Sequence, residues 1–131
     1  MSLFMLDTDS VSFALRGHGD VAAELARHRP SEVCVSSITV AELRFGADKR
    51  GSRKIHHAID KFLLGVEVSP FDEAAATRFG VIAAELARRG TLIGQMDTLI
   101  AAHALSIDAT LVTNNKRHFS KVEGLNLENW T

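Results

Sequence analysis

The stretch Leu3-Phe4-Met5-Leu6-Asp7-Thr8-Asp9 decides how this chain is expected to fold. Four consecutive apolar residues at positions 3–6 predict a short strand that is buried on both faces, as in a parallel sheet. Small polar residues follow the strand directly. Because ligands bind beyond the carboxyl ends of the strands in open α/β sheets, Asp7 is predicted to lie at the edge where a functional site forms.

Apolar strands and amphipathic helices alternate along the rest of the chain. Further strands are predicted at 32–35, 66–68, 109–112 and 125–127. Helices are predicted at 10–16, 20–29, 38–49, 52–64, 73–89 and 96–105. This alternation predicts an α/β fold, specifically an α/β/α sandwich with a mainly parallel central sheet, formed by one domain over residues 1–131.

The composition is that of a globular protein. Hydrophobic residues make up 46% of the chain and charged residues 24%. Cys34 is the single cysteine, which excludes an intramolecular disulfide and a cysteine-rich zinc cluster. The apolar run at 3–6 is too short for a signal peptide, and no segment is long enough to span a bilayer. We therefore expect a cytoplasmic protein with no membrane partner.

The charge balance gives little sign of a nucleic-acid partner. The net charge is −1, whereas nucleic-acid binders are usually basic. Basic residues do gather in one segment, at Arg44, Lys49, Arg50, Arg53, Lys54 and Lys61. Such a patch can meet phosphates or an acidic partner, and a solvated helix–loop–helix corner would have the same composition.

Asp7 and Glu42 are the first two candidate site residues. Asp7 has an ordinary alternative role as a helix cap, but Asp9 can fill that role equally well and leave Asp7 free. Glu42 shares a helix face with Ile38, Phe45 and Gly46, a stripe that is predicted to face the core. An unpaired charge there needs a cation or a metal ion, unless Glu42 lies at the edge of the stripe and reaches solvent.

Asp97 is the strongest single candidate. It is the one charged residue of a segment at 96–105 that is apolar almost all round, provided that His103 is neutral. The helix is therefore predicted to be buried, with Asp97 in its first turn, where the helix dipole favours an anion. Carboxylates that converge from distant parts of a chain are what Mg²⁺ or Mn²⁺ needs in order to promote phosphodiester cleavage.

Several motifs in the same order give the chain a family resemblance over essentially its whole length. It resembles the VapC-type PIN-domain toxins, which are ribonucleases of type II toxin–antitoxin pairs. The matching stretches are Met5-Leu6-Asp7-Thr8-Asp9, Val35-Ser36-Ser37 with the following residues to Gly46, Gly94-Gln95-Met96-Asp97 with the following residues to Ala104, Leu111-Val112-Thr113-Asn114-Asn115, and the segment 122–130 that ends at Trp130.

The resemblance implies a PIN fold and an endoribonuclease that depends on Mg²⁺ or Mn²⁺. It implies that a metal-activated water, held by Asp7, Glu42 and Asp97, cleaves RNA, with a tRNA as a plausible target. It also implies a homodimer and a cognate VapB-type antitoxin. Residues expected to orient water or substrate are Thr8, Ser37, Thr113 and Asn115. Residues expected to contact RNA or the antitoxin are Arg44, Lys49 and Arg50.

The sequence departs from the family at a further acid that many members carry after the fourth strand. No carboxylate is present there, and Asn115 or His118 would occupy that position. This departure leaves open whether one metal ion binds or two.

Two other functions remain open at this stage. The first is a PIN domain that binds RNA or an antitoxin without cutting. The second is a haloacid-dehalogenase-like phosphatase, because the segment 4–11 resembles that family's first motif, with Asp7 as nucleophile and Asp9 as general acid.

Overall fold

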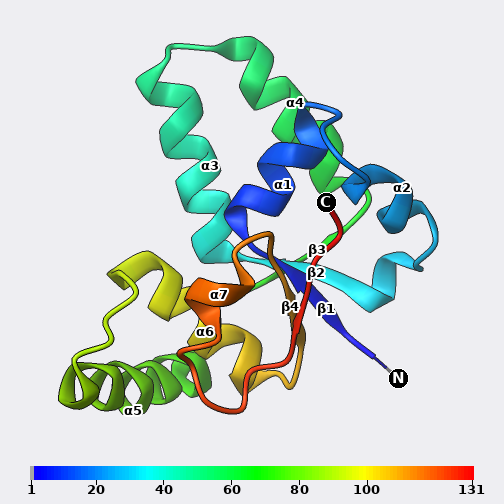
Figure 1. The fold of residues 1–131 in the computed structure, drawn as a ribbon. Coiled ribbons are helices and arrows are strands. Elements are labelled where there is room, and N and C mark those ends of the chain that lie inside the picture. The colour runs from blue at the N-terminus through cyan, green and yellow to red at the C-terminus, as the bar shows by residue number, and fades with distance from the viewer. Residues whose placement is uncertain (1) are drawn as a thin grey trace.

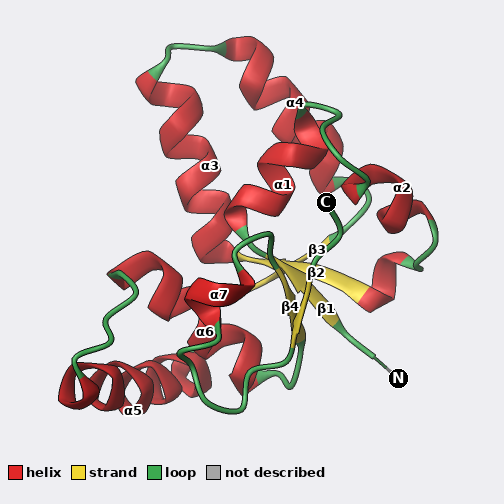
Figure 2. Ribbon diagram, in the orientation of Figure 1, coloured by secondary structure: helices red, strands yellow, loops and turns green. Residues whose placement is uncertain are grey.

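The computed structural model describes residues 2–131 and contains one five-stranded sheet. The strands lie in the order β3-β2-β1-β4-β5, and every neighbouring pair is parallel. Their bounds are β1 Phe4–Leu6, β2 Val33–Ser36, β3 Glu67–Ser69, β4 Thr110–Val112 and β5 Leu127–Glu128. The predicted α/β fold with a parallel central sheet is confirmed (Figure 2).

Helices cover both faces of this sheet. They are α1 Thr8–Leu15, α2 Val21–Ala26, α3 Ser37–Lys49, α4 Arg53–Leu63, α5 Glu73–Arg89, α6 Gln95–Ser106 and α7 Lys116–Phe119. Figure 1 shows α1 to α4 on one side of the sheet and α5 to α7 on the other. Within the described residues, no helix combines the length and the apolar character needed to cross a membrane.

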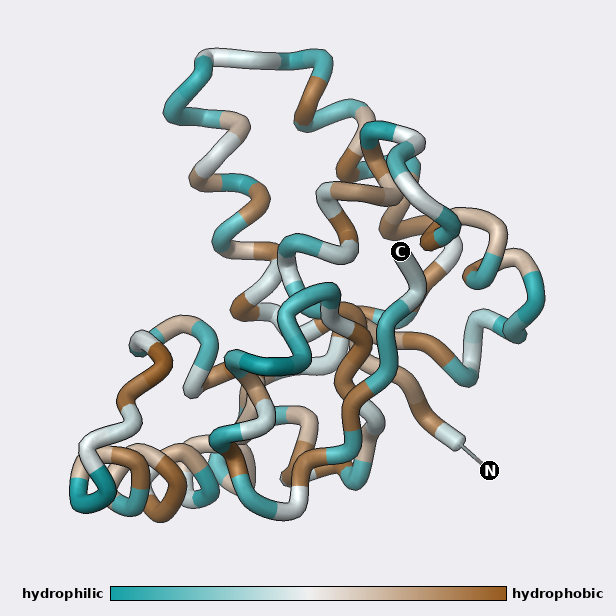
Figure 3. Tube along the Cα trace, viewed as in Figure 1, coloured by the Kyte–Doolittle hydropathy of each residue, from teal (hydrophilic) through white to brown (hydrophobic). Residues whose placement is uncertain are grey.

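The strands divide the core into two layers because successive side chains point to opposite faces. Met5, Cys34 and Leu111 face α5 and α6, where they pack with Leu86 and Ile100. Their neighbours along the strands face α1 to α4, and these are Leu6, Val35 and Val112. Brown hydrophobic segments therefore run through the centre of Figure 3, where the strands lie.

Most helix ends follow from local sequence. Ser36, Ser52 and Asp72 cap α3, α4 and α5 by accepting hydrogen bonds from backbone N–H groups, as expected of such residues. Helix α5 ends at Gly90, whose φ of 67° is easily reached only by glycine.

Some predicted bounds were wrong. Helix α1 begins at Thr8, two residues before its predicted start, and α2 is shorter than the predicted 20–29. The last strand is Leu127–Glu128, not 125–127, and α7 was not predicted.

The strand order fixes where a site can form. From the central strand β1, the sheet grows through β2 and β3 in one direction and through β4 and β5 in the other. The carboxyl ends of β1 and β4 therefore meet at the point where the topology reverses, and ligands of open α/β sheets bind at such points.

Candidate active site

Asp7 lies at this reversal point, directly after β1. Its backbone N–H donates to the carbonyl of Val112, the last residue of β4, over 3.0 Å. Its side chain caps α1 by accepting a 2.8 Å hydrogen bond from the Ser10 N–H. Of the two residues that could cap this helix, the structure therefore uses Asp7 and not Asp9. One residue both caps α1 and presents a carboxylate at the sheet edge.

The Asp7 carboxyl group is buried without a cation beside it. The residue is 4% exposed, and no arginine, lysine or histidine of residues 2–131 forms an ion pair with it. Burial raises the pKa of this carboxyl group, hydrogen bonds from Thr113 and Ser10 oppose the increase, and the charge of Asp9 adds to it. An added cation at this position would offset the desolvation of the carboxylate.

Glu42 comes to the same edge from α3, on a different face of the helix from the one predicted. Phe45, which was expected to share a core-facing stripe with Glu42, is 66% exposed. The residues of α3 that enter the core are Thr39, Leu43 and Ala47. Glu42 is half-buried at the border of this face, and the Thr8 hydroxyl group donates to its Oε1 over 2.6 Å. The buried-stripe argument for Glu42 was therefore wrong, although the residue is held beside α1.

Asp97 approaches from the first turn of α6, a helix that is buried along most of its length, as predicted. Its Oδ2 accepts a 3.0 Å hydrogen bond from His118 Nε2 on α7. Burial raises the pKa of the Asp97 carboxyl group, the His118 contact lowers it, and the charge of Asp9 raises it. The charge of Asp9 raises the pKa of both Asp7 and Asp97, which indicates that these three carboxylates lie near one another.

The residues expected to orient water or substrate differ in burial and in their hydrogen-bond partners. Thr113 is fully buried directly after β4 and hydrogen-bonds to Asp7, whereas Asn115 is exposed and its backbone N–H donates to the Thr113 hydroxyl group over 3.0 Å. Ser37 lies at the start of α3, and its hydroxyl group accepts a hydrogen bond from the Phe71 N–H over 2.9 Å.

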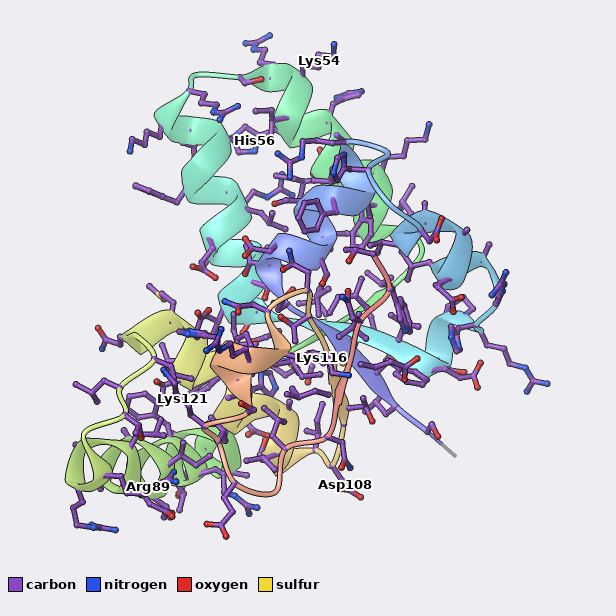
Figure 4. The ribbon with its side chains drawn as sticks, viewed as in Figure 1. Lys54, His56, Arg89, Asp108, Lys116 and Lys121 are labelled. Carbon is purple, nitrogen blue, oxygen red and sulfur yellow. The ribbon has the colours of Figure 1, made fainter. Side chains whose placement is uncertain are left out.

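The predicted basic contacts lie along the α3–α4 hairpin. Arg44 points away from the acids and pairs with Asp60 at 2.6 Å. Lys49 lies over the exposed ring of Phe45. Arg50 lines a groove between α1, α3 and α4 whose volume is about 420 Å³. The groove begins at Thr8 and Glu42 in the acidic region and reaches Arg16, Arg50 and Lys54, and Figure 4 shows Lys54 at the far end of the hairpin.

Sequence reasoning gave too little weight to two residues of this region. Asp9 was considered as a cap and, in the phosphatase alternative, as a general acid, but not as a charge that acts on both Asp7 and Asp97. His118 lies on a helix too short to produce a periodic signal, and it meets Asp97 across 21 positions of the chain. The phosphatase alternative is not supported, because β4 is followed by the buried Thr113 and Asp97 lies on α6.

Comparisons with known proteins agree with this arrangement. A model of the PIN domain matches residues 4–125. The chain is 39% identical over 131 residues to the tRNA(fMet)-specific endonuclease VapC of Salmonella typhimurium, and the match covers 99% of each chain. It is 40% identical over 131 residues to ribonuclease VapC2 of Haemophilus influenzae, again over 99% of each chain.

Solved structures show the same similarity. The structure of VapBC2 from Rickettsia felis, bound to a DNA fragment from its promoter, matches with a TM-score of 0.90 and 35% identity, over 98% of this chain and 99% of that one. DNA-bound VapBC from Salmonella typhimurium matches with a TM-score of 0.89 and 38% identity over the full length of both chains. This chain therefore belongs to the PIN-domain family and, within it, to the VapC ribonucleases.

Proposed function

We propose that this protein is a divalent-metal-dependent endoribonuclease whose metal ion, Mg²⁺ or Mn²⁺, is held by Asp7 and Asp97 with Glu42. The observation that carries the proposal is the buried Asp7 carboxylate at the reversal point of the sheet, with no cationic side chain of residues 2–131 beside it. A carboxylate in such a place is destabilising unless something outside the chain compensates its charge.

The donor chemistry fits a hard divalent cation. Asp7, Glu42 and Asp97 offer carboxylate oxygens, which are the ligands that Mg²⁺ and Mn²⁺ take, together with water and substrate oxygens. Across residues 2–131, no three acidic, histidine or cysteine side chains are already arranged to hold an ion. We therefore propose that the acidic side chains adjust on binding and that water and substrate complete the ligand set.

Each surrounding residue has a defined task in this scheme. A bound divalent ion supplies Lewis acidity toward a phosphodiester. Thr113 and Ser10 orient the Asp7 carboxylate by hydrogen bonding, and the Thr8 hydroxyl group fixes Glu42. Water and phosphate oxygens are the expected partners of the remaining lone pairs of these carboxylates. The position of Asp7 is set by its N-cap geometry and therefore does not depend on a flexible loop.

We further propose that RNA follows the groove between α1, α3 and α4. The groove joins the acidic region to the side chains of Arg50 and Lys54, which can contact phosphates. The substrate is proposed to be a tRNA, because a relative that matches over the full length is named a tRNA(fMet)-specific endonuclease. A VapB-type antitoxin is the proposed partner, since related structures are of VapBC, and we retain a homodimer as part of the proposal.

The test compares cleavage of purified tRNA by the wild-type protein, by Asp97→Asn and by Asp108→Asn. Asp108 is an exposed residue in the turn before β4, and its φ of 54° is well tolerated by asparagine. Figure 4 shows it at the end of the molecule opposite Lys54. Wild type and Asp108→Asn should cleave with Mg²⁺ or Mn²⁺ and not with EDTA, whereas Asp97→Asn should be inactive. RNA that stays intact with the wild-type protein and Mn²⁺ would indicate a binding module without nuclease activity.

A further inference from the structure

The position of the missing fourth acid has two candidates, and the structure separates them. Asn115 is exposed, and its side chain makes no capping hydrogen bond to α7. The His118 side chain is only 26% exposed, and its Nε2 lies 3.0 Å from Asp97 Oδ2. His118 is therefore the candidate whose side chain contacts an acid of the site, through Asp97.

We propose that His118 supplies an imidazole nitrogen to the metal centre and that this ligand makes the centre favour Mn²⁺ over Mg²⁺. The inference rests on the proposed metal-dependent function, because it concerns the same site. It adds one nitrogen ligand to the carboxylate oxygens of Asp7, Glu42 and Asp97, which gives a mixed centre. The chemical consequence is a changed metal preference, which can be measured without any RNA.

The separation of the two side-chain atoms suits shared coordination. Two neighbouring ligands of an octahedral ion, each about 2.1 Å from it, are about 3.0 Å apart. The observed distance between Asp97 Oδ2 and His118 Nε2 is 3.0 Å. In the metal-free protein the proton on Nε2 holds the two atoms together. A neutral imidazole can carry its proton on Nδ1 instead, which leaves the Nε2 lone pair free for a metal ion.

The backbone around His118 holds the ring in place. The neighbouring Phe119 is buried in the core, and its ring meets the His118 ring edge-on at 5.4 Å. The Asn115 carbonyl group accepts hydrogen bonds from the N–H groups of His118 and Phe119 at 3.1 and 3.2 Å. His118 therefore approaches Asp97 from an anchored turn, as a metal-binding residue requires.

A purely structural role explains this contact less well. The Asp97 side chain is 42% exposed, and ion pairs as accessible as this one contribute little to stability. His103 differs, since both of its ring nitrogens are used by Ser36 and Ser69 in the core. The metal preference follows from ligand chemistry, because Mg²⁺ takes oxygen ligands whereas first-row transition ions also bind imidazole.

The direct test is pulsed electron paramagnetic resonance of Mn²⁺ bound to the RNA-free protein, which detects a coordinated ¹⁴N nucleus. Wild type should show this nitrogen coupling, and His118→Gln should lose it. His57→Gln is the matched control, because His57 is exposed on α4, and it should keep the coupling. Calorimetry should show about tenfold weaker Mn²⁺ binding in His118→Gln, with Mg²⁺ binding changed much less.

A second variant guards against a folding defect. His118→Glu replaces the nitrogen with a carboxylate and should bind Mg²⁺ more tightly than wild type, while losing the nitrogen coupling. Saturable Mn²⁺ binding without nitrogen coupling in wild type would overturn the role of His118 and leave the proposed nuclease intact. RNA cleavage in EDTA, together with no Mn²⁺ binding, would overturn both.

Discussion

Two charged regions of this molecule treat their carboxylates in opposite ways. In the α3–α4 hairpin, Arg44 pairs with Asp60 at 2.6 Å, and His56 lies between Arg44 and Asp48. The hydrogen bond from Arg44 lowers the pKa of the Asp60 carboxyl group. At the sheet edge, by contrast, burial raises the pKa of Asp7, and no basic side chain of residues 2–131 pairs with it.

The difference indicates which region can bind a cation from outside the chain. In the hairpin, Arg44 and Asp60 neutralise each other within the chain, so this pair needs no partner from outside. The carboxyl end of β1 leaves a buried negative charge uncompensated, which is expected at a functional site and unfavourable elsewhere. The four predictions below test this contrast, from the largest expected effect to the smallest.

Replacing Asp7 with asparagine should give the largest change in activity. Asparagine is as good a helix cap as aspartate, so α1 should keep its start while the anionic oxygen is lost. We expect RNA cleavage to fall about 100-fold or more, as the loss of several kcal/mol of transition-state stabilisation implies. Initial rates of tRNA cleavage with Mn²⁺ provide the measurement. Asp60→Asn in the hairpin is the control and should keep full activity, and an equal loss in both variants would contradict the contrast.

Replacing Thr8 with valine should have a smaller effect, because Thr8 acts through Glu42. The variant loses the 2.6 Å hydrogen bond that fixes the carboxylate and keeps nearly the same shape. We expect about a tenfold decrease in cleavage, typical of a residue that orients a functional group. Thr91→Val is the matched control, because the buried Thr91 Oγ1 has no hydrogen-bond partner among residues 2–131. A Thr8→Val protein with wild-type kinetics would show that Glu42 needs no such support.

The stability of Asp7→Asn should change in the direction opposite to its activity. Because the folded-state pKa of Asp7 is raised, its favourable contribution is fully present below its ordinary pKa of 3.8 and is lost as the pH rises through the raised value. At neutral pH in EDTA, Asp7→Asn should therefore be more stable than wild type. Chemical denaturation at several pH values measures this gain, which should disappear in strong acid.

With metal ions present, the order of stability should be reversed, so that wild type is more stable than Asp7→Asn. Mn²⁺ that binds the folded wild type raises its stability by mass action, whereas the variant binds more weakly and gains less. A wild-type protein that is already more stable than Asp7→Asn in EDTA would mean that the Asp7 charge is compensated within the chain.

Much of the fold could be predicted from the sequence, because an apolar run such as 3–6 allows little except a buried parallel strand. Asp97 could also be predicted as a site residue, since one acid on an otherwise apolar helix stands out in the sequence. The cap role of Asp7 beside its proposed role as a metal ligand could not be predicted, because a capping and a metal-binding aspartate look identical in sequence. For Glu42, residue periodicity placed Phe45 in the core, but α3 turns that ring to solvent. His118 depended on a long-range contact with α6 that no local pattern encodes.

The smallest effect should come from Asp60→Asn, and its pH dependence should have the opposite sign to that of Asp7→Asn. Because Arg44 lowers the pKa of Asp60, the stability from this pair is fully present above the ordinary value of 3.8 and is lost as the pH falls through the lowered value. The variant should be slightly less stable than wild type at pH 7, and the difference should shrink with added salt, because the pair is exposed. Denaturation at low and high salt tests this. If removal of Asp60 instead stabilised the protein at neutral pH, as removal of the Asp7 charge should, the hairpin would also be an uncompensated region, and burial without a partner would no longer distinguish the active site.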